Sequence, residues 1–261
     1  MHAEPTRRRG TPCGCGVEDD AMTEAEWLTC TDPTPMLEFL RGKASDRKLR
    51  LFAAACCRRV WHLLNADVSK PGVEVIERYS DGLATDSELD AVFQAAARYG
   101  RRAERKFGRR SPEADLAYRD SQQAYLVSYA AQRDVHLGMV LIYTTQCKLR
   151  EVVGYKPYID PKAHEEWHRL VEADGANLAV LLSEVIGNPF RPVTVDPRWL
   201  TSTAVALARA IYDERAFDRL PILADALEDA GCDNTDLLAH CRGDGPHVRG
   251  CWAVDLVLGK E

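Results

Sequence analysis

Apolar residues recur every three or four positions along most of this 261-residue chain, which is the spacing of amphipathic α-helices. Helix-start signals stand in front of several of these runs. Thr23 and Thr85 are each followed, three residues later, by a glutamate, and this is the pattern of a capping box. Ser111 is followed by a proline, which favours the first position of a helix. The sequence therefore predicts an all-α fold built as a multi-helix array.

Two stretches give specific expectations for the N-terminal part. Ser45 is predicted to cap a helix that runs to about Ala66. From Ser111 to about Val153 the only helix breaker is Gly138. We therefore expect one long central helix there, or two helices joined at a bend near Gly138.

The segment 187–197 contains three prolines, which bar a helix and favour an extended connector. We expect a helical N-terminal domain over 22–187, a proline-rich connector over 188–200 and a helical C-terminal subdomain over 201–261. Residues 1–21 show no periodicity and are expected to be a disordered tail or a misassigned gene start. Short helices are expected over about 201–212, 216–230, 233–242 and 251–258, the last being a helix in preference to a buried strand.

Composition limits where in the cell this protein is expected and which classes of partner it is expected to bind. The chain carries 34 Lys and Arg against 40 Asp and Glu, and a net charge of −6 argues against a chain-wide nucleic-acid or membrane binder. No apolar run approaches the ~20 residues of a transmembrane helix. The nine cysteines are odd in number, and no secretory signal precedes them. We therefore expect a soluble cytoplasmic protein that does not act on membranes.

Several stretches at the two ends of the chain resemble one protein family. They are MTEAEWL (22–28), RKLRLFAAACCRRVWHLL (47–64), IGNPFRPVTVDP (186–197), LPILADALEDAGC (220–232) and HVRGCWAVDLVLGK (247–260). Together they resemble a large paralogous family of uncharacterised proteins from planctomycete bacteria. The stretch 220–232 is also similar to the helical repeat-companion domain found beside leucine-rich repeats in these bacteria. The resemblance implies an accessory or interaction role and supplies no catalytic residue.

One motif suggests hydrolysis. The segment 164–168, HEEWH, fits the H-E-x-x-H pattern, in which two histidines one helical turn apart bind zinc and the glutamate activates water. It falls on a predicted helix, as that mechanism requires. Charged neighbours and the lack of a well-spaced third ligand favour a solvated helix face instead. A zinc-dependent hydrolase acting through His164, Glu165 and His168 stays an alternative.

A second pattern suggests structural zinc. Four residues have the spacing C-x8-C-x5-H-x3-C: Cys232, Cys241, His247 and Cys251. Three thiolates and one imidazole make a sound tetrahedral zinc set. The spacing resembles that of zinc fingers that bind single-stranded RNA, with the last two ligand types exchanged. Such fingers are mostly irregular loop, whereas 233–241 is predicted to be a capped helix. In the other interpretation, Cys232 and Cys251 are core thiols.

The segment 98–110, RYGRRAERKFGRR, holds seven Lys or Arg against one Glu, with Tyr99 and Phe107 between them. Basic and aromatic side chains together can bind phosphate and stack on bases. The segment is equally well explained as a solvated helix end and turn, or as a surface that pairs with the acidic part of a neighbouring molecule, such as its acidic segment 213–244. A zinc-stabilised nucleic-acid-binding protein is therefore a further alternative.

The sequence contains no complete catalytic set, and we expect a non-enzymatic protein-interaction or adaptor module with an unidentified protein partner. No catalytic residue and no cofactor is predicted. Zinc stays open as an alternative at Cys232, Cys241, His247 and Cys251, or at His164 and His168.

Overall fold

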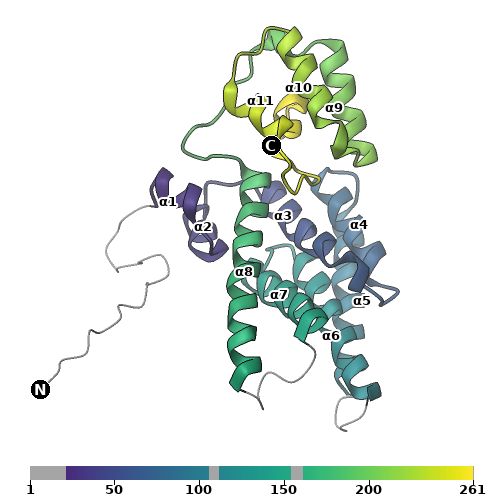
Figure 1. Ribbon diagram of the computed structural model, residues 1–261. Helices are drawn as coiled ribbons and strands as arrows, with labels where there is room; N and C mark the ends of the chain where they lie inside the picture. The colour runs from purple at the N-terminus through teal and green to yellow at the C-terminus, as the bar shows by residue number, and fades with distance from the viewer. Residues whose placement is uncertain (1–21, 106–111, 154–160, 261) are drawn as a thin grey trace, which may run out of the picture.

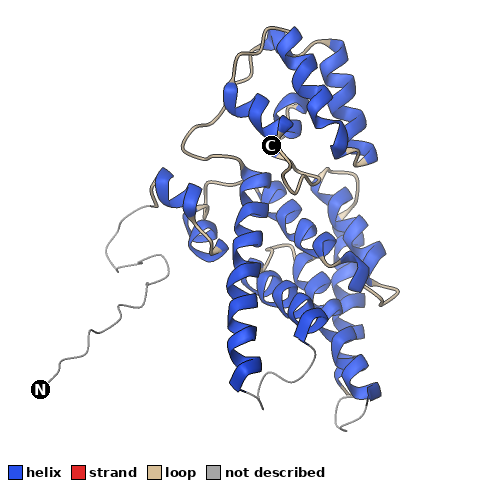
Figure 2. Cartoon of the chain, in the orientation of Figure 1, coloured by secondary structure: helices blue, strands red, loops and turns tan. Residues whose placement is uncertain are grey.

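The computed structural model describes residues 22–105, 112–153 and 161–260, with their side chains except those of 112–115, 150–153, 161–164 and 167. Within these ranges the chain forms twelve α-helices and three short 3-10 helices, and no strand (Figure 2). The predicted all-α fold is confirmed. None of the helices in the described ranges is both long and apolar enough to span a membrane. The expectation for residues 1–21 lies outside the described residues.

The first eight helices form an array around α3 (Figure 1). Helix α3 packs against α4, α6, α7 and α8, and its residues 50–57 are all buried. Both predicted capping boxes form, at Thr23 and Thr85. The helices are α1 (Glu24–Thr29), α2 (Pro33–Phe39), α3 (Asp46–Arg59), α4 (Ser69–Ser80), α5 (Asp86–Glu104), α6 (Pro112–Ala130), α7 (Leu137–Val153) and α8 (Pro161–Ile186).

The helix that Ser45 caps ends at Arg59 instead of continuing to about Ala66. Val60 leaves the helical conformation with φ −108° and ψ 22°, and a 3-10 turn over 61–63 follows. The side chain of Ser45 accepts a hydrogen bond from the backbone N–H of Lys48, as the sequence predicts.

The stretch 112–153 is two helices, the second of the two alternatives predicted, and the break between them lies at 131–136, just before Gly138. Gly138 belongs to the first turn of α7. The guanidinium of Arg50 donates to the backbone carbonyls of Gln132 and Arg133, each at 2.6 Å. In a continuous helix these carbonyls would accept hydrogen bonds from backbone N–H groups of the next turn. Here the side chain of Arg50 donates to them instead, and the helix is interrupted at these residues.

The last four helices enclose a second hydrophobic cluster. It is formed by buried residues between Trp199 and Val257, whereas the first cluster is formed by residues between Trp27 and Val185. Helices α9 to α12 are here called the C-terminal unit (residues 201–260). They are α9 (Ser202–Glu214), α10 (Leu220–Asp229), α11 (Thr235–Arg242) and α12 (Trp252–Leu258).

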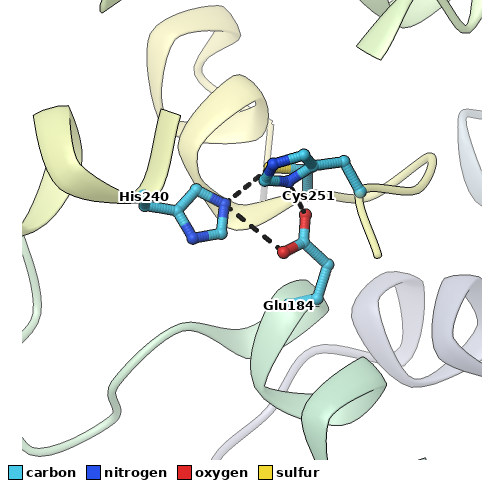
Figure 3. Close-up of side chains that lie close together, drawn as sticks. Glu184, His240 and Cys251 are labelled. Atoms are coloured by element: carbon cyan, nitrogen blue, oxygen red, sulfur yellow. Dashed lines mark hydrogen bonds and ion pairs between the residues drawn. The ribbon is translucent and has the colours of Figure 1, made fainter. Parts of the chain in front are cut away.

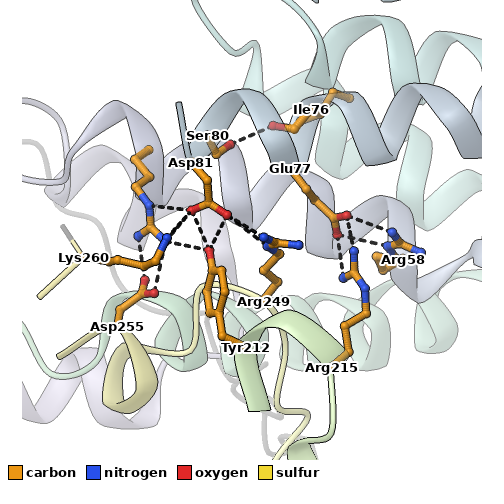
Figure 4. A network of polar contacts seen from close by, with 11 residues as sticks. Arg58, Ile76, Glu77, Ser80, Asp81, Tyr212, Arg215, Arg249, Asp255 and Lys260 are labelled. Carbon is orange, nitrogen blue, oxygen red and sulfur yellow. Dashed lines mark hydrogen bonds and ion pairs between the residues drawn. The ribbon is translucent and has the colours of Figure 1, made fainter. Parts of the chain in front are cut away.

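A buried polar network joins the C-terminal unit to α3 and α4 (Figure 4). At its centre the carboxylate of Asp81, which is 1% exposed, follows the last turn of α4. It accepts hydrogen bonds from the Tyr212 hydroxyl at 2.7 Å, from Arg249 at 2.7 Å and from Lys260 at 3.0 Å. Arg47 approaches from α3 at 3.1 Å. One carboxylate of the first array thus binds three side chains of the C-terminal unit.

Two further carboxylates extend this network. Asp255 of α12 is 1% exposed and pairs with Arg47 at 2.7 Å and with Lys48 at 2.6 Å. Glu77 of α4 accepts from Arg215, which follows α9, at 2.9 Å. Buried pairs leave an uncompensated charge when one partner is withdrawn, so the network strongly disfavours separation of the two cores.

Candidate functional site

Four potential metal-binding side chains meet where the end of α8 reaches the C-terminal unit (Figure 3). Glu184 lies in the last turn of α8, and His240 lies near the end of α11. His247 lies in the loop after α11, and Cys251 is the residue before α12. Their donor atoms lie within 4.8 Å of one another. We call these four residues the Glu184 cluster.

The distances within the Glu184 cluster are short. Nδ1 of His247 lies 2.9 Å from Oε1 of Glu184. Nε2 of His240 lies 3.2 Å from Sγ of Cys251 and 3.5 Å from Oε2 of Glu184. Solvent has little access, because Cys251 is fully buried and the side chains of Glu184, His247 and His240 are 4%, 9% and 17% exposed. The four donors therefore form a closed cluster with little access for solvent.

Hydrogen bonds from outside the cluster set the proton positions on the two rings. Nε2 of His247 lies 3.0 Å from the carbonyl of Gly243, which can only accept, so this nitrogen carries a proton. The indole N–H of Trp252 donates to Nδ1 of His240 at 3.0 Å. Because the indole is only a donor, Nδ1 of His240 holds a lone pair, and neutral His240 carries its proton on Nε2. Nδ1 of His247 thus faces Glu184 and donates to it when the ring is protonated, and His240 directs an N–H at Glu184 and Cys251.

The ionisation of the cluster follows from these contacts. Burial alone would raise the pKa of Glu184, but hydrogen bonds from His240 and His247 outweigh it and lower the pKa to about 2. Burial opposes protonation of His247, but the hydrogen bond to Glu184 outweighs burial and raises the pKa of His247. Burial raises the pKa of the Cys251 thiol well above its ordinary value. The arrangement is that of a carboxylate between two imidazoles, beside a protonated thiol.

The structure brings together two of the four residues that the C-x8-C-x5-H-x3-C spacing suggests. His247 and Cys251 belong to the Glu184 cluster, whereas Cys232 and Cys241 are buried within the hydrophobic cluster of the C-terminal unit. Burial raises the pKa of Cys241 to about 12, as expected for an inert core thiol. Cys241 is one residue after His240 on α11, so the two side chains point to different faces of the helix.

Sequence reasoning missed His240 and Glu184. His240 has a usable signal, since it extends the pattern to H-x6-H-x3-C. Glu184 precedes His247 by 63 residues and belongs to another helix, and no local spacing connects them. Only the packing of α8 against the C-terminal unit brings it to the histidines.

The H-E-x-x-H motif lies in the first turns of α8, and the Glu184 cluster lies at the opposite end of the same helix (Figure 1). At about 1.5 Å per residue, His168 and Glu184 are separated by about 24 Å along the axis. Glu165 and His168 are exposed, and the side chain of His164 lies outside the described residues. The motif and the cluster are therefore separate.

Only part of the basic segment 98–110 is described. Arg98, Arg101, Arg102 and Arg105 are exposed near the end of α5, whereas 106–110 lie outside the described residues. The hydroxyl of Tyr99 donates to Asp120 at 3.4 Å. This end of α5 lies at the opposite end of the molecule from the C-terminal unit (Figure 1). The arginines and the Glu184 cluster do not share one surface.

A groove of about 870 Å³ lies beside the Glu184 cluster, between the two cores. This volume falls within the range of ligand pockets, which is about 300–1,000 Å³. Its walls come from α1 and α2, the start of α3, the end of α8 with the connector, and α12. Its apolar lining includes Leu28, Phe39, Ile186, Pro189, Pro192, Val193, Val195, Trp252 and Leu256.

Specific contacts hold the walls of the groove in place. Glu24 pairs with Arg191 at 2.6 Å and accepts from Asn188 at 2.8 Å, which fixes the connector to α1. Phe39 stacks on Phe190, with ring centroids 5.0 Å apart. The groove is therefore formed before any ligand binds.

Comparison of the chain with protein-family models, with curated proteins and with solved structures gives no match.

Proposed function

We propose that this chain is a non-enzymatic protein-interaction module that binds an apolar, acidic peptide segment of a partner protein in the groove. The observation that carries the proposal is that one groove has both an exposed apolar side chain and a cation in its lining. Leu28 lines the groove and is 65% exposed. Nζ of Lys43, also in the lining, lies 3.4 Å from the centre of the Phe39 ring. Such a pair suits a segment with one apolar anchor and one carboxylate.

Apart from Lys43, the lining holds six charged residues among those that the structure describes, of which all but Asp236 are paired within the protein, and this supports binding over catalysis. Glu24 forms an ion pair with Arg191, and Asp255 forms one with Lys48. Lys260 forms an ion pair with Asp81. The first two pairs each join one wall of the groove to another and so fix its shape. Within the part of the chain that the structure describes, no carboxylate pairs with Lys43. The ammonium group of Lys43 can therefore form an ion pair with a carboxylate of the ligand.

The test is a selection of displayed random peptides on the full chain, followed by binding measurements with fluorescently labelled peptides. Selected peptides should share an apolar residue and an acidic residue. Leu28→Arg should abolish binding, because a charge replaces the apolar wall. Leu83→Arg is the matched control, since Leu83 is 67% exposed and does not line the groove.

A charge reversal tests the acidic preference. Lys43→Glu should weaken binding of acidic peptides and favour their lysine-substituted analogues. Equal losses with Leu28→Arg and Leu83→Arg would contradict the proposal. Indifference of the selected peptides to Lys43→Glu would contradict the acidic part of it.

A further inference from the structure

The Glu184 cluster has the donors of a zinc site. Two imidazoles, one thiol and one carboxylate come from α8, α11 and the loop between α11 and α12, and they face one another. Zinc binds these ligand types in a tetrahedral arrangement. Thiolate with imidazole selects zinc over magnesium and calcium, which prefer oxygen ligands.

The donor spacing fits one ion. A tetrahedral ion about 2.1–2.3 Å from each donor places the donors about 3.4–3.8 Å apart. The distances of 2.9 Å from His247 to Glu184, 3.2 Å from His240 to Cys251 and 3.5 Å from His240 to Glu184 lie near this range. No pair of donors exceeds 4.8 Å. Movements of about an ångström complete the geometry.

The partner of His247 outside the cluster also suits metal binding. Metal-bound histidines usually donate their other ring N–H to a carbonyl or carboxylate, which fixes the tautomer. Nε2 of His247 makes this contact with the carbonyl of Gly243. Nδ1 of His247 is then the ligand nitrogen.

His240 needs one exchange. The Trp252 indole donates to Nδ1 of His240, so its proton lies on Nε2, the nitrogen that faces the other donors. Zinc on Nε2 requires the proton on Nδ1, and the bond from Trp252 is then lost. One hydrogen bond is given up for a set of metal–ligand bonds, so the exchange favours the metal.

We propose that Glu184, His240, His247 and Cys251 bind one zinc ion that fastens the end of α8 to the C-terminal unit. The site is structural, because four protein donors close it and leave no position for substrate. It goes beyond the proposed peptide binding and does not depend on it. Binding displaces the Cys251 thiol proton and the proton shared by His247 and Glu184.

The test begins with the full chain purified without added metal. Elemental analysis should find about one zinc per chain. After removal of metal by a chelator, Co²⁺ should produce the thiolate-to-cobalt charge-transfer absorption that marks a cysteine ligand. Zinc content no higher than a buffer blank together with no such absorption would overturn the proposal. These two measurements need no variant.

Variants identify the ligands. Cys251→Ser should remove the charge-transfer absorption, and His247→Gln should weaken zinc binding by more than ~100-fold, beyond the effect of losing an outer-shell contact. Cys241→Ser is the matched control, because Cys241 is equally buried, lies nearby and is outside the cluster. Loss of the absorption in Cys241→Ser but not in Cys251→Ser would overturn this ligand set.

Discussion

Replacing Asp81 by Asn tests whether the buried network holds the two cores together. The substitution keeps the shape of the side chain and removes its charge. The side chain of Asp81 is 1% exposed and pairs with Arg249 and Lys260 of the C-terminal unit, and with Arg47 of α3. With asparagine there, Asp255 is the one carboxylate left at the centre of the network. The cations then repel one another in a region with little water.

The expected loss follows from this burial. Removing one partner of a buried ion pair costs about 3–5 kcal/mol, because the remaining charge is uncompensated. Asparagine still offers one acceptor to the Tyr212 hydroxyl, so we expect the lower end, about 3 kcal/mol. A domain of ordinary stability has only about 5–15 kcal/mol in total. The loss should therefore be plain in a urea titration.

The assay is urea unfolding followed by circular dichroism, with hydrogen exchange to locate the change. Amides of α9 and α12 should exchange faster in the variant, whereas those of α5 and α6 should change little. Glu166→Gln is the control, because its pair with Arg169 is exposed and should be worth about 0–1 kcal/mol. If Asp81→Asn costs no more than Glu166→Gln, the network does not hold the cores together.

Two further predictions concern pH and backbone geometry. Burial alone would raise the pKa of Asp81 and of Glu77, but hydrogen bonds from their partners outweigh it and lower both pKa values in the folded state. The two ionised carboxylates stabilise the folded state fully above their ordinary pKa values of 3.8 and 4.5, and this stabilisation is lost as pH falls through the lowered values. Calorimetry should therefore show that the melting temperature decreases below about pH 4. The decrease should be smaller in Asp81→Asn. Gly187 has φ +80°, and an added Cβ would lie 3.1 Å from Cγ of Trp252, whereas a Cβ on the helical Gly138 meets nothing within 4 Å. Alanine should therefore destabilise the protein by about 1 kcal/mol or more at Gly187 and stabilise it by about 0.5–1 kcal/mol at Gly138. Shifts of the melting temperature in the same direction for both variants would contradict this.

The fold class could be predicted because helix periodicity and capping are local properties. The boxes at Thr23 and Thr85 need only neighbouring residues, and both form. A break near Gly138 is one of two alternatives from the sequence, but its position at 131–136 could not be predicted, because the Arg50 side chain that bonds the carbonyls there lies 82 residues before Gln132. Gly138 itself is tolerated in the first turn of α7, so it lies next to the break and not in it.

The candidate site shows the same limit. His247 and Cys251 lie close in sequence, and their residue types indicate metal binding without knowledge of the fold. Glu184 has no such neighbour, because the packing of α8 against the C-terminal unit brings it there. Cys232 and Cys241 fit the spacing but belong to the hydrophobic core. Spacing along the sequence does not determine which face of α11 the Cys241 thiol occupies.

Trp252 connects the two proposals and allows them to be separated. Its ring lines the groove, and its indole N–H donates to His240. Trp252→Phe keeps an apolar ring in the wall and removes the donor. Zinc on Nε2 of His240 requires Nδ1 to be protonated, so losing a donor that competes for Nδ1 should leave zinc affinity equal or higher. Peptide binding should persist, because the apolar wall remains. If the variant instead loses zinc while retaining its helical circular dichroism, the indole supports the site in another way, and His240 is not a ligand through Nε2.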